Sequence, residues 1–79
     1  MINQEKLVQA FVIALGISES SVVDTLTYES IPQWDSVAHM ALVTELEAAF
    51  DVMLDTEEIL AMSSVAATRE ILIKHGAEF

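Results

Sequence analysis

The stretch Trp34-Asp35-Ser36-Val37 lies where an irregular segment ends and the most regular pattern in the chain begins. From Ser36 to Phe50, apolar residues recur at helical spacing and fall on one side of a helix when each residue is placed at ~100° per step. Asp35 is a good N-cap, because its carboxylate can accept hydrogen bonds from the free N–H groups of the first turn. The pattern therefore predicts a helix over 36–50 with a serine in its first turn.

The two sides of this predicted helix differ in character. The side that we expect to be buried carries four large apolar groups and consists of His39, Leu42, Val43, Leu46, Ala49 and Phe50. The other side consists of Ser36, Val37, Met40, Ala41, Thr44, Glu47 and Ala48. A serine in a first turn is most often only a cap or a structural residue. An exposed serine beside an exposed apolar strip is, however, also typical of a modification site with a docking surface.

In the segment before this helix, the sequence predicts one helix and a long loop. Asn3 can cap a first helix that runs to about Leu15, where Gly16 can take the left-handed conformation that ends it. Residues 18–35 sustain no long element, although 20–23 can form one short turn. We expect this loop to be anchored by its own apolar side chains, which are Val22, Leu26, Tyr28, Ile31 and Trp34.

Two more helices are expected after Phe50. Asp55 and Glu58 have the spacing of a capping box for a short third helix that reaches about Met62. Ser63 or Ser64 can cap a fourth helix over 65–75, with Val65, Thr68, Leu72 and Ile71 directed inward and Gly76 at its end. The predicted fold class is all-α, a four-helix bundle with a long first loop and a short third helix, in a single domain over 1–79.

Charge is the strongest signal in the composition. The chain has 13 acidic residues, 3 basic residues and a formal net charge of −10, and no lysine or arginine lies between Lys6 and Arg69. Nucleic acid and anionic membranes are therefore unsuitable partners, whereas proteins with basic patches suit this charge. No apolar run is long enough to span a bilayer, and the absence of cysteine fits a reducing cytoplasm. We expect an unprocessed cytoplasmic protein.

Metal binding and hydrolysis fit the sequence poorly. There is no cysteine, and His39 and His75 share no motif. A calcium loop starting at Asp51 would need glutamate in its twelfth position, where Met62 stands. A catalytic pair of Ser36 and His39 would lack the glycine-flanked turn that presents such a nucleophile, and so small a bundle offers little concave surface for a substrate. We expect no metal and no enzyme activity.

The order of the motifs resembles the acyl carrier protein family. The run 34–37 followed by 42–52 is similar to that family's second helix, in which a D-S-L serine precedes an L-x-x-x-L-E-x-x-F pattern. Residues 55–58 and 63–67 resemble the starts of its third and fourth helices. The resemblance covers essentially the whole chain in order and implies a bundle of the acyl-carrier-protein type.

The resemblance also implies a function. Ser36 would be the hydroxyl to which a phosphopantetheinyl transferase attaches 4′-phosphopantetheine from coenzyme A, and Asp35 would help to position the serine and the transferase. The arm would supply the thiol that the chain does not encode. The positions that in the family contact transferases and acyl-loading or acyl-processing enzymes match Val37, Met40, Ala41 and Glu47. The chain would be a monomeric phosphoprotein carrier of thioesters.

Three departures from the family pattern favour a specialised carrier. Val37 stands in place of the usual leucine, Trp34 replaces a glycine-rich approach, and Ala48 and Ala49 occupy positions that are often acidic in fatty-acid carriers. The predicted docking strip is therefore less charged than in a general fatty-acid carrier. Polyketide, modified-sugar or aminoacyl transfer is the expected pathway class, in preference to general fatty acid biosynthesis.

Two alternatives remain open on the sequence. The chain could be a non-covalent adaptor, whose acidic helical face recruits a basic partner and whose Ser36 is only structural. Separately, several apolar residues could either line a cavity for an acyl chain or simply pack tightly, which is the simpler interpretation. These residues are Leu46, Phe50, Leu54, Ile59 and Ala67.

Overall fold

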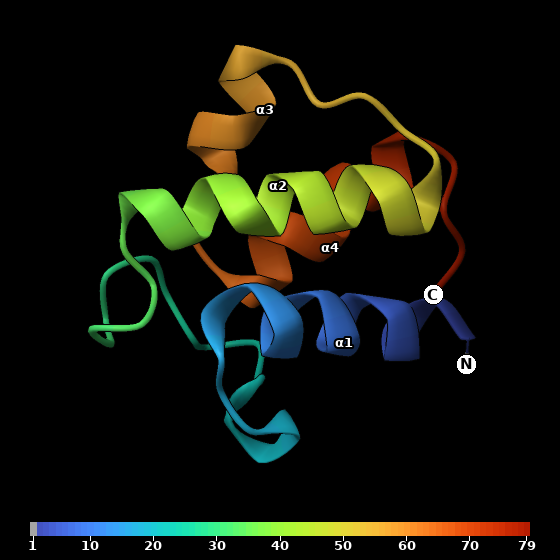
Figure 1. The fold of residues 1–79 in the computed structure, drawn as a ribbon. Helices are drawn as coiled ribbons and strands as arrows, with labels where there is room; N and C mark the ends of the chain where they lie inside the picture. Colours follow the sequence, from blue (N-terminus) through green and yellow to red (C-terminus); the bar gives the residue numbers. More distant parts are fainter. Residues whose placement is uncertain (1) are drawn as a thin grey trace.

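The computed structural model describes residues 2–79, whose regular elements are all helical (Figure 1). Its elements are α1 (Ile2–Leu15), a 3₁₀ turn η1 (Glu19–Ser21), α2 (Ser36–Phe50), α3 (Thr56–Ala61) and α4 (Val65–Lys74). The Cα radius of gyration is 11.1 Å, close to the ~11.6 Å expected for a compact chain of this length. The predicted all-α class, the long first loop and the short third helix are confirmed.

The long helix α2 occupies the middle of the arrangement. Figure 1 shows α1 lying along α2 in the opposite direction, with α3 on the other side of α2 and α4 behind them. Gly16 and Gly76 follow α1 and α4 with φ of 66° and 96°, as expected for residues that end helices. One cap prediction was wrong: Asn3 lies inside α1, and its Nδ2 donates to the carbonyl of Glu78 at 2.9 Å.

The apolar faces of α1, α2 and α4 meet in one core. The buried residues of these helices are Leu7, Ala10, Phe11 and Leu15 from α1, Leu42, Val43 and Leu46 from α2, and Val65, Thr68, Ile71 and Leu72 from α4. Three residues that were predicted on the buried side of α2, namely His39, Ala49 and Phe50, are only partly buried, because they lie at the edges of its apolar stripe. Leu46 and Leu54 belong to the core, with Phe50 and Ile59 packed against it, which favours tight packing over an acyl cavity.

The long first loop is anchored to the core by Trp34. Its side chain is completely buried and meets the Phe11 ring edge-on, with 5.2 Å between centroids. The loop also forms an isolated antiparallel bridge to the start of α4, in which the N–H of Tyr28 donates to the Ser63 carbonyl and the N–H of Val65 to the Leu26 carbonyl. The loop therefore reaches α2 in a fixed direction.

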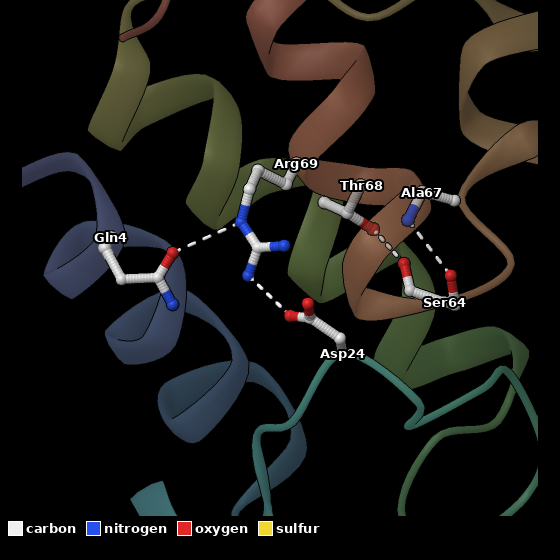
Figure 2. A network of polar contacts seen from close by, with 6 residues as sticks. All are labelled: Gln4, Asp24, Ser64, Ala67, Thr68 and Arg69. Atoms are coloured by element: carbon white, nitrogen blue, oxygen red, sulfur yellow. Dashed lines mark hydrogen bonds and ion pairs between the residues drawn. The ribbon is translucent and has the colours of Figure 1, made fainter. Parts of the chain in front are cut away.

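Arg69 ties three separate parts of the chain together (Figure 2). Its Nη2 lies 2.7 Å from Oδ1 of Asp24 in the long loop, and its Nε donates to Oε1 of Gln4 in α1 at 3.2 Å. Beside it, the N-cap Ser64 accepts from the N–H of Ala67, and its carbonyl accepts from the Thr68 hydroxyl. The arrangement holds the loop and α1 against the first turns of α4.

The Asp24–Arg69 pair should make stability depend on pH. The hydrogen bond to the guanidinium, followed by its charge, holds the pKa of the Asp24 carboxyl below its ordinary value, against a smaller opposing effect of desolvation. A carboxyl with a lowered folded-state pKa stabilises the fold above its unfolded pKa of about 3.9, and this contribution is lost as the pH falls through the folded pKa. We expect Asp24→Asn to lower the free energy of unfolding at pH 6 and to have progressively less effect as the pH drops below about 3.9.

Urea unfolding followed by circular dichroism across this pH range measures the effect. Glu70→Gln, on the exposed side of α4, is the matched control. If the free energies of unfolding of the wild type and Asp24→Asn differed by the same amount at every pH down to acid pH, the prediction would be contradicted.

Candidate functional site

Ser36 opens α2 at the end of the anchored loop and is exposed. Asp35 has extended backbone angles (φ −102°, ψ −175°), and its Oδ1 accepts from the N–H of Ala38 at 2.8 Å. Asp35 is thus the N-cap, as predicted. The side-chain hydrogen bonds within residues 2–79 include none to the Ser36 hydroxyl, so the hydroxyl faces solvent without a partner in the described chain.

A chain of two hydrogen bonds fixes the direction from which Ser36 is presented. Nε1 of Trp34 donates to Nδ1 of His39 at 2.9 Å, and Nε2 of His39 lies 2.9 Å from the carbonyl oxygen of Ile59. An indole N–H can only donate, so Nδ1 is the acceptor and Nε2 carries the proton that is donated to the carbonyl. These bonds connect the long loop, the first turn of α2 and α3.

This arrangement gives His39 a structural position. Both of its ring nitrogens are occupied, and its ring also lies against Trp34 and Tyr28, with centroids 6.1 and 5.1 Å away. His39 is partly buried at the edge of the core. The imidazole is therefore not directed at the Ser36 hydroxyl as a general base would be.

The residues predicted to form a docking strip divide into two groups. Val37 is 79% exposed, Met40 is 53% exposed, and Ala41 is also exposed, so these three form an apolar strip along α2 beside Ser36. Glu47 differs from the expectation, because it is half-buried and its Oε2 accepts from the N–H of Leu54 at 3.0 Å. Its carboxylate fastens the connection between α2 and α3.

Leu60 is a further exposed apolar residue, and nothing in the sequence pattern singles it out. It lies in α3 and is 77% exposed. The bond from His39 to Ile59 brings this part of α3 to the first turn of α2. A shallow hollow of about 120 Å³ opens there, lined by Tyr28, His39, Ile59, Leu60, Met62 and Ser63. Neighbouring apolar residues in so short a helix give no periodic signal, so Ile59 and Leu60 could not be separated into inner and outer positions.

Cations are scarce around Ser36. Arg69 is paired with Asp24, and Lys6 lies near the opposite end of α2, where its Nζ is 5.9 Å from the ring centre of Phe50. Within residues 2–79, no group of three or more His, Cys, Asp and Glu side chains is placed to hold a metal ion. The site thus offers an exposed hydroxyl, a helix N-terminus and an apolar strip on an acidic protein.

Comparisons with known proteins add no family to this description. No protein-family model matches the chain, and no curated protein matches it significantly. Over the described part of the chain, every helix is too short or too polar to cross a membrane. The chemistry open to Ser36 is therefore inferred from its own surroundings and from the motif order of the sequence.

Removing the His39 side chain should loosen this end of the bundle. His39→Ala would leave the buried Trp34 N–H without an acceptor and remove the bond to α3, so we expect the free energy of unfolding to fall by about 2 kcal/mol. Amide hydrogen exchange in α3 should become faster. Urea unfolding and exchange measured by NMR give the two readouts.

His75→Ala is the matched control for this substitution. The side chain of His75 has one hydrogen-bonding partner within residues 2–79, Glu58, whose Oε2 lies 2.8 Å from Nε2 near the surface. We expect its loss to change the free energy of unfolding by less than about 1 kcal/mol. An effect of His39→Ala no larger than that of His75→Ala, with unchanged exchange in α3, would show that the Trp34–His39–Ile59 connection does not hold the site.

Proposed function

We propose that the protein is a carrier that holds acyl or aminoacyl groups as thioesters on a 4′-phosphopantetheine arm at Ser36. The observation that carries this proposal is the exposed, unpartnered Ser36 hydroxyl in the first turn of α2, fixed by the Asp35 cap and followed by the exposed apolar strip of Val37, Met40 and Ala41. A structural serine would need neither this exposure nor this strip. The resemblance of the motif order to acyl carrier proteins supports the same function.

The attachment is a phosphoryl-group transfer from coenzyme A. The Ser36 oxygen forms a bond to the phosphorus that bears the pantetheine, the bond from that phosphorus to the remaining nucleotide breaks, and adenosine 3′,5′-bisphosphate leaves. The hydroxyl proton passes to a base of the transferase, since His39 is already engaged by Trp34 and Ile59. The attached arm supplies the thiol on which acyl groups are carried.

The surroundings of Ser36 fit a phosphodiester. The N–H groups at the start of a 15-residue helix and its dipole favour a negative charge beside them. Asp35 carries a like charge, but its Oδ1 is bound to the Ala38 N–H within the first turn. Because Ser36 is exposed, the phosphate would stay in solvent and the arm could swing between enzymes.

Partner enzymes would dock beside the arm through apolar contacts and basic residues. Val37, Met40 and Ala41 supply the apolar contacts on α2, and Leu60 extends them onto α3. Glu47 would act indirectly, because its carboxylate holds the connection that positions α3. The net charge of −10 favours enzymes with basic patches. Val37, which is smaller than the usual leucine, and the uncharged Ala48 and Ala49 favour a polyketide, modified-sugar or aminoacyl pathway.

Attachment of the arm can be tested in one step. The purified protein is incubated with coenzyme A and a broad-specificity phosphopantetheinyl transferase, and its intact mass is recorded. We expect the wild type to gain the mass of one phosphopantetheine group and Ser36→Ala to gain nothing. Ser20→Ala, which removes another exposed serine from η1, should be modified like the wild type.

If coenzyme A and the transferase do not modify Ser36, the second candidate function, a non-covalent acidic adaptor, is favoured. The specific observation in its favour is that Val37, Met40 and Leu60 are exposed whether or not Ser36 carries an arm. No mass increment in the wild type, or an increment that survives Ser36→Ala, would contradict the carrier function. Binding of a basic partner that is unaffected by Ser36→Ala would then identify an adaptor.

A further inference from the structure

A second hollow lies between α1 and α2, far from Ser36. It has a volume of about 310 Å³, and its lining includes Ile2, Glu5, Lys6, Ile13, Glu45 and Ala49. Figure 1 shows α1 and α3 on opposite sides of α2. The lining of this α1–α2 groove includes none of the apolar-strip residues and not Leu60. Nothing in the proposed carrier function uses it.

Small residues form the floor of the groove and large apolar residues form its rim. Ala10 is only 4% exposed, and Ala49 is half-buried, so their short side chains leave the space open. On the rim, Ile2 is 71% exposed and Ile13 is 64% exposed. Large apolar side chains exposed beside a hollow are typical of an interaction site.

The position of the groove leaves Ser36 accessible. Glu45 and Ala49 follow Ser36 by 9 and 13 residues, which places them about 14 and 20 Å along the axis of α2. A partner in the α1–α2 groove would therefore contact the half of α2 away from the serine. Binding there and modification of Ser36 are compatible.

The charges around the groove favour a cationic partner. Glu5 and Glu45 both belong to its lining. The one cation of the lining, Lys6, has its Nζ 5.9 Å from the ring centre of Phe50. A second copy of the chain would bring another net charge of −10 against the same acids and would be repelled.

The shape of the groove favours a helix over a small molecule. Ile2 and Ile13 are 11 residues apart on α1, which corresponds to about 17 Å, or three helical turns. Small-molecule sites enclose most of the ligand surface, whereas this groove is open along an exposed rim. We propose that the α1–α2 groove docks a basic amphipathic helix of a partner protein, with its apolar residues over Ala10 and Ala49 and its basic residues towards Glu5 and Glu45.

A synthetic peptide can serve as the probe. It would have about four helical turns, with leucines on one face and lysines on the other, and would be titrated into the ¹⁵N-labelled protein. We expect saturable amide shift changes at Ala10, Ile13, Glu45 and Ala49. A peptide of the same composition, scrambled so that its leucines do not share a face, should bind at least about tenfold more weakly.

Substitutions test whether the peptide binds in the groove or is attracted only by the overall negative charge of the protein. Ile13→Glu places a charge on the apolar rim and should weaken binding at least about tenfold, while Ile73→Glu, at a 43% exposed site on α4, should leave it within about twofold. Glu45→Gln should weaken binding more than the control Glu70→Gln. Ser36→Ala should bind the peptide like the wild type, so this proposal and the carrier function can fail separately.

Several results would overturn the proposal. Shift changes centred on Val37, Met40 and Leu60, or equal binding of the scrambled peptide, would show that the α1–α2 groove is not the docking site. Concentration-dependent dimerisation that protects Ile13 would identify a second copy as the occupant. Saturation of the same amides by decanoate, with displacement of the peptide, would identify an apolar small molecule.

Discussion

The buried indole of Trp34 anchors the end of the long loop to the core and to the start of α2. Its ring packs edge-on against Phe11 of α1, and its N–H needs an acceptor because it lies in the core. His39 supplies that acceptor and passes a second hydrogen bond to the carbonyl of Ile59 in α3. Trp34 and His39 together thus join the end of the long loop to three helices. The residue two positions later, Ser36, is consequently presented from a fixed backbone.

Different parts of the helix α2 contact different parts of the molecule. Its buried side forms the core with α1 and α4, its first turn is bonded to α3 through His39, and its far half borders the α1–α2 groove. Glu47 contributes to this division by fastening the connection to α3 through the Leu54 N–H. The serine end and the groove end are separated by most of the length of the helix, so the two proposed contacts would not overlap.

Local signals made most of the fold predictable from the sequence. Asp35, Asp55 and Ser64 cap helices as their side-chain chemistry suggests, and the periodic apolar residues of α1, α2 and α4 form the core. The features that the sequence did not predict have other causes. The partial burial of Glu47 and the Trp34–His39–Ile59 connection depend on contacts with residues outside the helix, which helical periodicity does not report. Asn3 was misplaced because a helix start without a strong signal can shift by a residue or two.

The proposed carrier function requires that Ser36 carry a covalent arm in the living cell. Peptide mapping by mass spectrometry of the protein purified from its own cells tests this requirement. We expect the peptide containing Asp35-Ser36-Val37 to carry phosphopantetheine on the serine, with the free thiol or an acyl group at the end of the arm. Recovery of this peptide only with an unmodified serine, from cells that use the protein, would contradict it.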